Sequence, residues 1–319
     1  MPKDDKKGMI RAGKLLPLIL KPETAQPAKP RTPIQLRFLT MPEDEEEVVF
    51  QHSVLCQTCI PYRDPGADVR LWDRRNGRLS MRIQAGTAWD AARETWVDVG
   101  LPYGPKPRLV MYHLNTEALR TQTAEVELED SLTAFVKRTL SLDTKGRNIR
   151  TVKEQITRLA AADFRFGAGM DGHSLTVKGS VIDAFDLWTT KDEKQRLLWP
   201  STVRFSSVYF QSLMQHAVPL NEAAVSRLSH SAMGLDIYTW LAQRLHRVDP
   251  KKPAFVPWVS LKEQFGQGYD RMNNFKRFFR AALAQVQEVY RAAKFEVNDR
   301  GMTLHNSTPP VLRRLIQIP

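Results

Sequence analysis

Apolar and polar positions alternate with a period of two in the part of the chain that follows residue 47. Leu79, Met81 and Ile83 share one face of a stretch from 78 to 84, and a strand-like stretch from 70 to 74 precedes it. The two stretches are joined at Asn76 and Gly77, the dipeptide best suited to a tight type I′ turn. We therefore expect short strands from 48 to about 100, ended by the Gly- and Pro-rich residues 100–107.

Beyond residue 107 the apolar positions recur at the helical period, and the order of predicted elements repeats. The first set is helices at 108–120, 131–140 and 147–162 followed by strands at 164–166 and 175–177. The second set is helices at 231–247, 260–265 and 272–291 followed by strands at 295–297 and 302–304. Strands at 181–188 and 202–205 are expected to connect the two sets.

One local pattern supports a duplicated topology. Residues 161–166 and 292–297 share the pattern Ala-Ala-x-Phe-x-apolar, each at the junction between a helix and a hairpin. In the last predicted helix, the periodicity points one set of residues inward: Phe275, Phe278, Phe279, Ala282, Val286 and Val289. For the predicted helix at 131–140, Asp130 or Ser131 is the expected N-cap.

The order helix, turn, basic helix, hairpin is typical of a winged helix-turn-helix. The predicted fold class is thus α+β, with tandem winged helix-turn-helix modules, a small β-rich N-terminal segment and a flexible basic tail. The expected divisions are a tail and acidic linker at 1–47, the β-rich segment at 48–106, a first module at 107–190 and a second at 191–319.

The charge of the chain indicates a polyanionic partner. The formal net charge is +12, with 47 Lys and Arg against 35 Asp and Glu. Residues 1–40 contain nine basic and three acidic residues, and seven of the twenty prolines lie in 1–42. That composition favours a flexible tail rather than a packed core.

Much of the remaining basic excess falls on two predicted helices. Residues 137–165 contain eight basic and three acidic residues, and 262–294 contain seven and three. Arg and Asn on the outer face of a helix supply donors for base edges, while Lys and Arg neutralise phosphates. The predicted DNA-binding residues are Lys145, Arg147, Asn148, Arg150, Thr151, Lys153, Arg158, Asn273, Asn274, Lys276, Arg277, Arg280 and Arg300.

Two other interpretations of the basic residues compete with DNA binding. Each basic face, taken alone, fits an ordinary solvated helix surface. A membrane surface fits less well, because the outer faces lack the Trp, Phe and Leu that an interfacial helix buries. The aliphatic run from Leu15 to Leu20 is too short for a bilayer span or a signal peptide, and two cysteines cannot form a disulfide framework. We expect a cytoplasmic protein that does not associate with a membrane.

Motifs for catalysis or cofactor binding are missing from the sequence. It contains no P-loop, no His-x-His pair and no Gly-x-Ser-x-Gly, so no enzymatic activity and no cofactor are predicted. His52, Cys56 and Cys59 have zinc-ligand types at close spacing, but a structural zinc site needs four ligands. Ordinary packing is therefore favoured over a metal site or a redox pair.

Several runs resemble a known protein family. Residues 96–110 (WVDVGLPYGPKPRLV), 113–120, 130–138 and 149–153 are similar to the plasmid-encoded RepA replication initiators of Gram-negative bacteria. The resemblance covers roughly residues 48–310. It implies an initiator that binds repeated sites (iterons) in double-stranded DNA at a plasmid origin, helps to open the adjacent duplex, and recruits host replication initiator and helicase-loading proteins. A homodimer is a further possibility that the resemblance leaves open.

Two rival functions use the same residues. A winged-helix transcriptional regulator without origin activity would need the same modules, so only an origin-dependent replication assay separates it. A nicking or strand-transfer enzyme would need a nucleophile, for which Tyr103, Tyr112 and Tyr209 are candidates. The lack of a metal-binding His pair disfavours this second rival.

Overall fold

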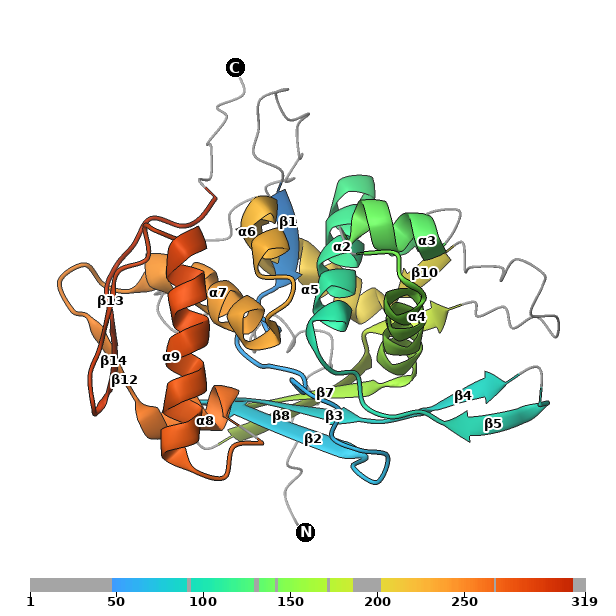
Figure 1. Cartoon of the computed structure of the whole chain (residues 1–319), viewed down its shortest axis with the longest axis horizontal. Coiled ribbons are helices and arrows are strands. Elements are labelled where there is room, and N and C mark those ends of the chain that lie inside the picture. The colour runs from blue at the N-terminus through green and yellow to red at the C-terminus, as the bar shows by residue number, and fades with distance from the viewer. Residues whose placement is uncertain are drawn as a thin grey trace, which may run out of the picture.

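The computed structural model describes residues 48–311 except for 91–92, 129–131, 141–142, 171–172, 186–201 and 267. The predicted tail at 1–47 and the predicted N-cap at Asp130 or Ser131 lie outside the described residues. Within them the protein mixes helices and strands, which confirms the coarse fold class (Figure 1).

The first half of the chain supplies most of the strands. Its elements are β1 (Val48–His52), β2 (Leu71–Asn76), β3 (Leu79–Gln84), β4 (Thr87–Asp90), β5 (Thr95–Asp98), α2 (Pro105–Thr121), β6 (Glu125–Glu127), α3 (Leu132–Ala134), the π-helical turn η2 (Phe135–Thr139), α4 (Gly146–Ala161), β7 (Asp163–Met170), β8 (His173–Ser180) and β9 (Ile182–Phe185).

The second half is mostly helical. Its elements are β10 (Thr202–Phe205), α5 (Ser207–His216), β11 (Ala217–Asn221), α6 (Glu222–Arg227), α7 (Ala232–Arg244), the 3-10 turn η3 (Leu245–Arg247), β12 (Ala254–Pro257), α8 (Trp258–Phe265), α9 (Met272–Val289), β13 (Phe295–Val297) and β14 (Gly301–Leu304).

The predicted hairpin is confirmed, but the predicted type I′ turn at Asn76 and Gly77 is wrong, because Asn76 still pairs with Leu79 and only Gly77 of the two has a positive φ. Strands β2 and β3 pair antiparallel, and Gly77 has a φ of 57°, which a residue with a side chain rarely adopts. Leu79, Met81 and Ile83 are buried and the residues between them are exposed, as the alternation predicted. The strand β7 adds to β3 and β8 to β7, so the sheet has the order β2-β3-β7-β8.

Strands from distant parts of the sequence pair with one another. β1 pairs with β11, and β6 pairs with β10, which also pairs with β9. Because β3 pairs with β7, the predicted β-rich segment also shares one sheet with the hairpin β7–β8 of the first predicted module. In Figure 1 this four-stranded sheet lies along the bottom of the molecule with the helices above it.

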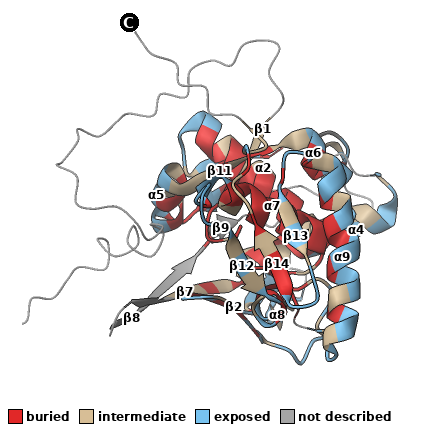
Figure 2. Cartoon of the chain, turned by 90° about the vertical axis from the view of Figure 1, so that its left-hand side faces the viewer, coloured by how far each residue is buried: buried red, intermediate tan, exposed pale blue. Residues whose placement is uncertain are grey.

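The last part of the chain has a simple topology. After α7, the strand β12 leads into α8 and α9, and the hairpin β13–β14 folds back so that the sheet order is β12-β14-β13. Phe275, Phe279 and Val286 of α9 are fully buried, and α7 and α9 pack against each other. Figure 2 shows the buried residues concentrated between these helices, α2 and the sheet.

Two inward assignments in α9 need correction. Phe278 is 38% exposed, so the prediction that it points into the core is wrong, and so is the expectation that the outer face of this helix carries no Phe. Its neighbours Phe275 and Phe279 fill the core and pack on Trp258, at ring-centroid distances of 6.1 and 5.7 Å. Val289, at the last turn, is only half-buried.

A buried ion pair joins α2 to α7. Arg108 donates from Nε and Nη2 to the two carboxylate oxygens of Asp236, at 2.6 and 2.7 Å. The same guanidinium donates to the carbonyl oxygens of Gly104 and Ile60. Burial lowers the pKa of Arg108, but the adjacent Asp236 raises it by more, so the net shift is upward and the guanidinium stays charged. Burial also raises the pKa of Asp236, against the opposing effect of Arg108. The contact fixes the two halves of the chain against each other.

Candidate nucleic-acid interface

Helix α4 is amphipathic, and its first half presents the predicted basic residues. Val152, Ile156 and Leu159 are buried on the core side, while Lys145, Arg147 and Arg150 are exposed. The helix forms because its apolar residues recur every three or four positions and it contains no proline. Arg147 and Arg150 are thus available to an external partner.

Three other predicted residues in this region already have intramolecular contacts. Lys145 pairs with Asp143 at 2.9 Å and remains highly exposed. Asn148 accepts from Lys106 Nζ at 2.9 Å and donates to the Asp143 carbonyl oxygen. Thr151 donates its hydroxyl to the Arg147 carbonyl oxygen within the helix. Lys153 is half-buried. Although Lys145 pairs with Asp143, its ammonium group remains in solvent, where it can approach a phosphate.

Lys106 is a basic residue near α4 that sequence reasoning missed. It stands in the first turn of α2, and burial together with the charge of Arg147 lowers its pKa. Its hydrogen bond to Asn148 places it beside the N-terminus of α4. The Pro-Lys-Pro sequence directly before the predicted helix at 108–120 offered a signal, because proline is favoured in the first turn of a helix.

The helical wheel predicted that Arg158 faces outward, and this prediction is wrong. Its side chain is only 15% exposed and pairs with Glu154 at 2.6 Å. It also donates to the carbonyl oxygen of Leu101 at 3.1 Å and lies over the ring of Tyr103. The segment around residue 101 covers this end of the helix, and that segment could not be placed from periodicity alone.

Helix α9 presents a similar face in the second half of the chain. Asn273, Asn274, Arg277 and Arg280 are exposed on the side opposite the buried phenylalanines. Lys276 donates to the carbonyl oxygen of Asp299 at 3.1 Å. The contact brings the β13–β14 hairpin against the helix.

The hairpin also contributes charge beside α9. Arg280 lies 3.8 Å from the Asp299 carboxylate and over the ring of Trp258. Arg300, at the hairpin turn, is exposed, and its backbone N–H donates to the Asn298 side chain. The turn therefore places one basic side chain next to the exposed face of the helix.

Both helices begin without a side-chain cap. The N-cap positions are Lys145 for α4 and Arg271 for α9, and neither helix has an acidic residue in its first turn. Ser206, Asn221 and Ser231 cap α5, α6 and α7 through their side chains, whereas α2 and α8 also lack a side-chain cap. An uncapped N-terminus carries partial positive charge and free N–H groups, so it favours a nearby phosphate.

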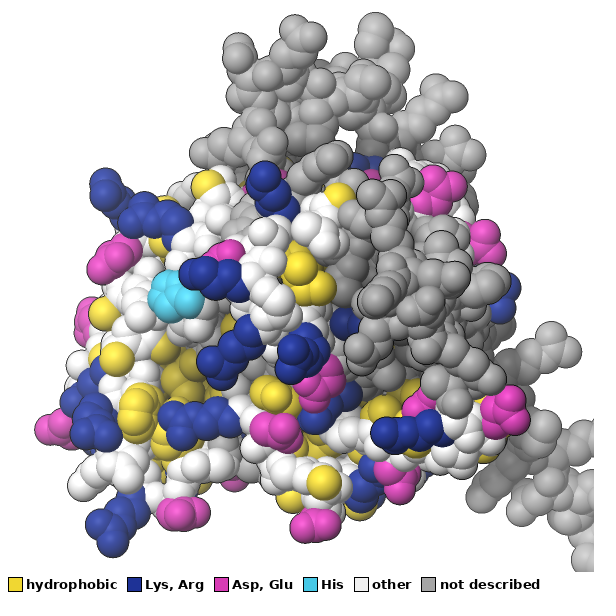
Figure 3. Space-filling model, turned by 45° about the vertical axis from the view of Figure 1, so that its right-hand side comes forward, with side chains coloured by type: hydrophobic (Ala, Val, Ile, Leu, Met, Phe, Trp, Pro, Cys, Tyr) yellow, Lys and Arg dark blue, Asp and Glu magenta, His cyan; other side chains and the backbone are white. Residues whose placement is uncertain are grey.

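The two basic helices lie on the same side of the molecule. In Figure 1 both face the viewer, and in Figure 2 both lie along the same edge. Figure 3 shows Lys and Arg side chains spread over the described part of the face it displays, with Asp and Glu among them rather than in a separate patch. The two helices, though far apart in the sequence, thus lie on one side of the protein.

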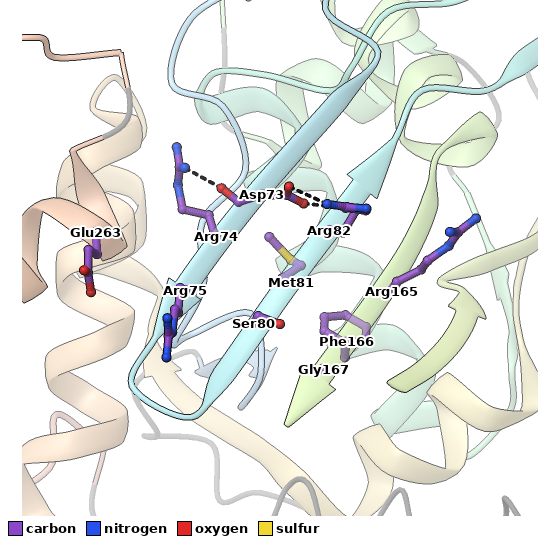
Figure 4. A pocket seen from close by; sticks show the side chains of 10 residues that line it. All are labelled: Asp73, Arg74, Arg75, Ser80, Met81, Arg82, Arg165, Phe166, Gly167 and Glu263. Atoms are coloured by element: carbon purple, nitrogen blue, oxygen red, sulfur yellow. Dashed lines mark hydrogen bonds and ion pairs between the residues drawn. The ribbon is translucent and has the colours of Figure 1, made fainter. Parts of the chain in front are cut away.

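A second group of arginines surrounds a hollow of about 590 Å³ beside β2, β3 and β7 (Figure 4). Arg82 donates to both carboxylate oxygens of Asp73, at 2.6 and 2.7 Å. Arg165 pairs with Asp163 at 3.2 Å, and Glu263 lies at the rim. Acidic partners therefore offset the charge of Arg82 and Arg165 beside the hollow.

The residues with zinc-ligand types are occupied by packing contacts. His52 Nδ1 accepts from the N–H of Val54, and Nε2 contacts Ser212 Oγ at 3.0 Å. Cys59 donates its thiol to the carbonyl oxygen of Gln264 at 2.8 Å. Burial raises the pKa of both cysteine thiols. Among the described residues, no three His, Cys, Asp or Glu are grouped to hold a metal ion.

The candidate tyrosine nucleophiles differ in exposure. Tyr112 is buried in α2, and Tyr209 is buried with its hydroxyl donating to Asn115. Burial raises the pKa of both, and of the partly exposed Tyr103. A higher pKa reduces the fraction of nucleophilic phenolate at neutral pH.

Comparison with known proteins identifies the family. Residues 101–258 match the model of a family described as plasmid-encoded RepA protein. The chain is therefore a plasmid replication initiator by class. It belongs to the RepA family, as the sequence runs around 96–120 predicted.

Two crystal structures of domains 2 and 3 of RctB are similar to the chain. The selenomethionine derivative has a TM-score of 0.49 and 6% identity, covering 80% of this chain and 99% of that chain. The other has a TM-score of 0.44 and 8% identity, covering 76% and 83%. No curated protein matches the chain in sequence. Within the described residues, the helices are too short or too polar to cross a membrane.

Proposed function

We propose that this initiator binds repeated sites at a plasmid origin through two winged-helix modules, with α4 and α9 as the recognition helices. The observation that carries the proposal is that two uncapped basic helices, each leading into a β-hairpin, lie on one side of the protein. A helix of this kind fits the major groove, where Arg and Asn read base edges.

The second module gives the stronger topological support. The order α7, β12, α8, α9, β13, β14 with the sheet β12-β14-β13 is that of a winged helix, with β13–β14 as its wing. The first module has the order α2, β6, α3, α4, β7, β8, but β6 pairs with β10 and β7 pairs with β3. We interpret it as a winged helix whose wing is extended into a larger sheet.

The proposed contacts divide by chemistry. Arg147, Arg150 and Arg277 are exposed at or near the outward face of their helices and would read bases, together with Asn273 and Asn274. The remaining basic positions would neutralise phosphates: Lys145, Lys153, Lys276, Arg280 and Arg300. With helices in successive major grooves, the two half-sites would have centres about 10–10.5 bp apart.

Bound at the origin, the protein would promote opening of the neighbouring duplex and recruit host replication initiator and helicase-loading proteins. A homodimer would double the number of modules on a repeated site. No catalytic step is assigned to the chain. The alternative is a winged-helix transcriptional regulator, and an origin-dependent replication assay in cells separates the two, because a regulator would not sustain replication.

Fluorescence anisotropy on labelled duplexes tests the DNA contact directly. The DNA that flanks the gene would first be footprinted with the full chain. Arg150→Ala and Arg277→Ala are each expected to weaken binding by about 1–3 kcal/mol and to relax the base preference at one position.

Arg227→Ala provides the matched control, since it removes the same charge from an exposed position on α6. It should change the affinity little. Equal effects of all three substitutions would show that only net charge matters, and unchanged binding by both helix variants would exclude α4 and α9 as recognition helices.

A further inference from the structure

An aromatic side chain stands among the polar groups on the outer face of α9. Phe278 is 38% exposed, whereas Phe275 and Phe279 on either side are fully buried. Asn274 and Ala281, one turn before and after it, are also exposed. These residues form one outward strip, because positions three and four apart lie on the same helix face.

The ring of Phe278 is held in place by two neighbours. Arg277 stacks its guanidinium over the ring, 4.9 Å from the centroid. The ring of Tyr269, from the segment before the helix, lies 5.4 Å away at 39°. An exposed aromatic ring fixed in this way is preorganised for a contact, and it also restricts the conformations open to Arg277.

The surroundings define what the ring can recognise. Among its neighbours on the strip are the amide of Asn274, which can pair with a base edge, and the small side chain of Ala281, which allows close approach. In the major groove, the apolar group on a base edge is the 5-methyl of thymine. A ring between an amide and a guanidinium therefore fits a thymine next to a hydrogen-bonded base.

We infer that Phe278 is a specificity-determining residue that contacts the 5-methyl group of one thymine in each bound site. The inference rests on the proposed role of α9 as a recognition helix. It adds a requirement that hydrogen-bonding residues cannot impose, because uracil and thymine present the same donors and acceptors.

Replacing single thymines by deoxyuridine removes only the methyl group. The full chain would be used to select its preferred duplex from a random pool, and each thymine of that site would then be replaced in turn. Wild type should bind about four-fold more weakly when the contacted thymine is replaced, the value for burying one methyl group. Phe278→Ala should bind the unmodified site more weakly and lose the distinction between thymine and uracil.

The matched control is Phe255→Ala, which removes another exposed aromatic of the same module, on β12. It should keep the wild-type preference for thymine. Because Phe278 lies outside the core, the variant should fold, and circular dichroism and thermal unfolding check this.

The outcomes separate this inference from the function on which it rests. Equal binding of thymine and uracil at every position by wild type, or a thymine preference that survives Phe278→Ala, overturns the role of Phe278 while Arg277→Ala still reports on α9. Failure of wild type to select any duplex overturns both proposals.

Discussion

The buried pair of Arg108 and Asp236 gives the sharpest stability prediction. Its side chains are 4% and 8% exposed, and two hydrogen bonds of 2.6 and 2.7 Å join them across α2 and α7. In Asp236→Asn, an amide N–H would face a guanidinium N–H. Arg108 would then keep its charge in the core while losing one acceptor and its counter-ion.

The expected cost is large because neither group can turn to water. Removing one partner of a buried pair destabilises a protein by about 3–5 kcal/mol, since it leaves an uncompensated charge. At roughly 2 °C per kcal/mol for a chain of this size, the midpoint of thermal unfolding should fall by about 6–10 °C. The free energy of unfolding would be measured from urea titrations followed by circular dichroism.

The protein contains a second Arg–Asp pair with the same geometry as Arg108 and Asp236 but with exposed side chains, so it serves as a control. Arg82 and Asp73 make the same two hydrogen bonds, at 2.6 and 2.7 Å, with side chains 49% and 57% exposed. Asp73→Asn should therefore cost less than about 1 kcal/mol. A similar cost for both substitutions would refute the reasoning that burial, rather than geometry, sets the magnitude.

A double replacement isolates the coupling between the two groups. Arg108→Met combined with Asp236→Leu removes both charges and leaves apolar side chains of comparable volume. The combined cost should be smaller than the sum of the two single costs by at least about 2 kcal/mol. Additive costs would show that the pair does not act as a unit.

Three further predictions concern binding, pH and Arg158. If about eight phosphates are neutralised, log K should fall against log salt with a slope near −7, and a slope shallower than about −3 would contradict a two-module contact. Burial lowers the pKa of His52 to about 3 and of His113 to about 4, from 6.5. As the pH is lowered, these histidines therefore take up protons in the unfolded chain at a higher pH than in the folded chain. Between pH 6.5 and about 4, lowering the pH should reduce the free energy of unfolding by up to about 1.4 kcal/mol per pH unit for each histidine. A free energy of unfolding from urea titrations that does not change with pH would contradict this. Arg158→Ala should destabilise the fold by about 1.5–3 kcal/mol in urea titrations, with little change in DNA affinity measured by anisotropy; the reverse pattern would restore Arg158 to the proposed interface.

Local sequence patterns were sufficient for most of the elements. The helical period placed α4 and α9 within two residues of their ends, and Asn76 with Gly77 located the first hairpin. These features depend on residues a few positions apart, so they can be recognised in the sequence without knowledge of the tertiary structure. The same patterns identified the two basic helix faces, since charge and period together define a face.

Tertiary contacts decided what the patterns could not. Strand pairing between β1 and β11 or between β3 and β7 joins segments far apart in sequence, and period-two alternation specifies a face but no partner. Arg158 faces inward because the segment around Leu101 covers it.

The helical wheel likewise gave the candidate faces of α9 but not the depth of each residue. Phe278 remains outside because Phe275 and Phe279 already occupy the core against Trp258. The sequence by itself thus determined most of the elements, most of the two charged faces and the family resemblance. The three-dimensional packing alone decided which side chains on those faces remain in solvent, because that depends on what the rest of the chain brings against them.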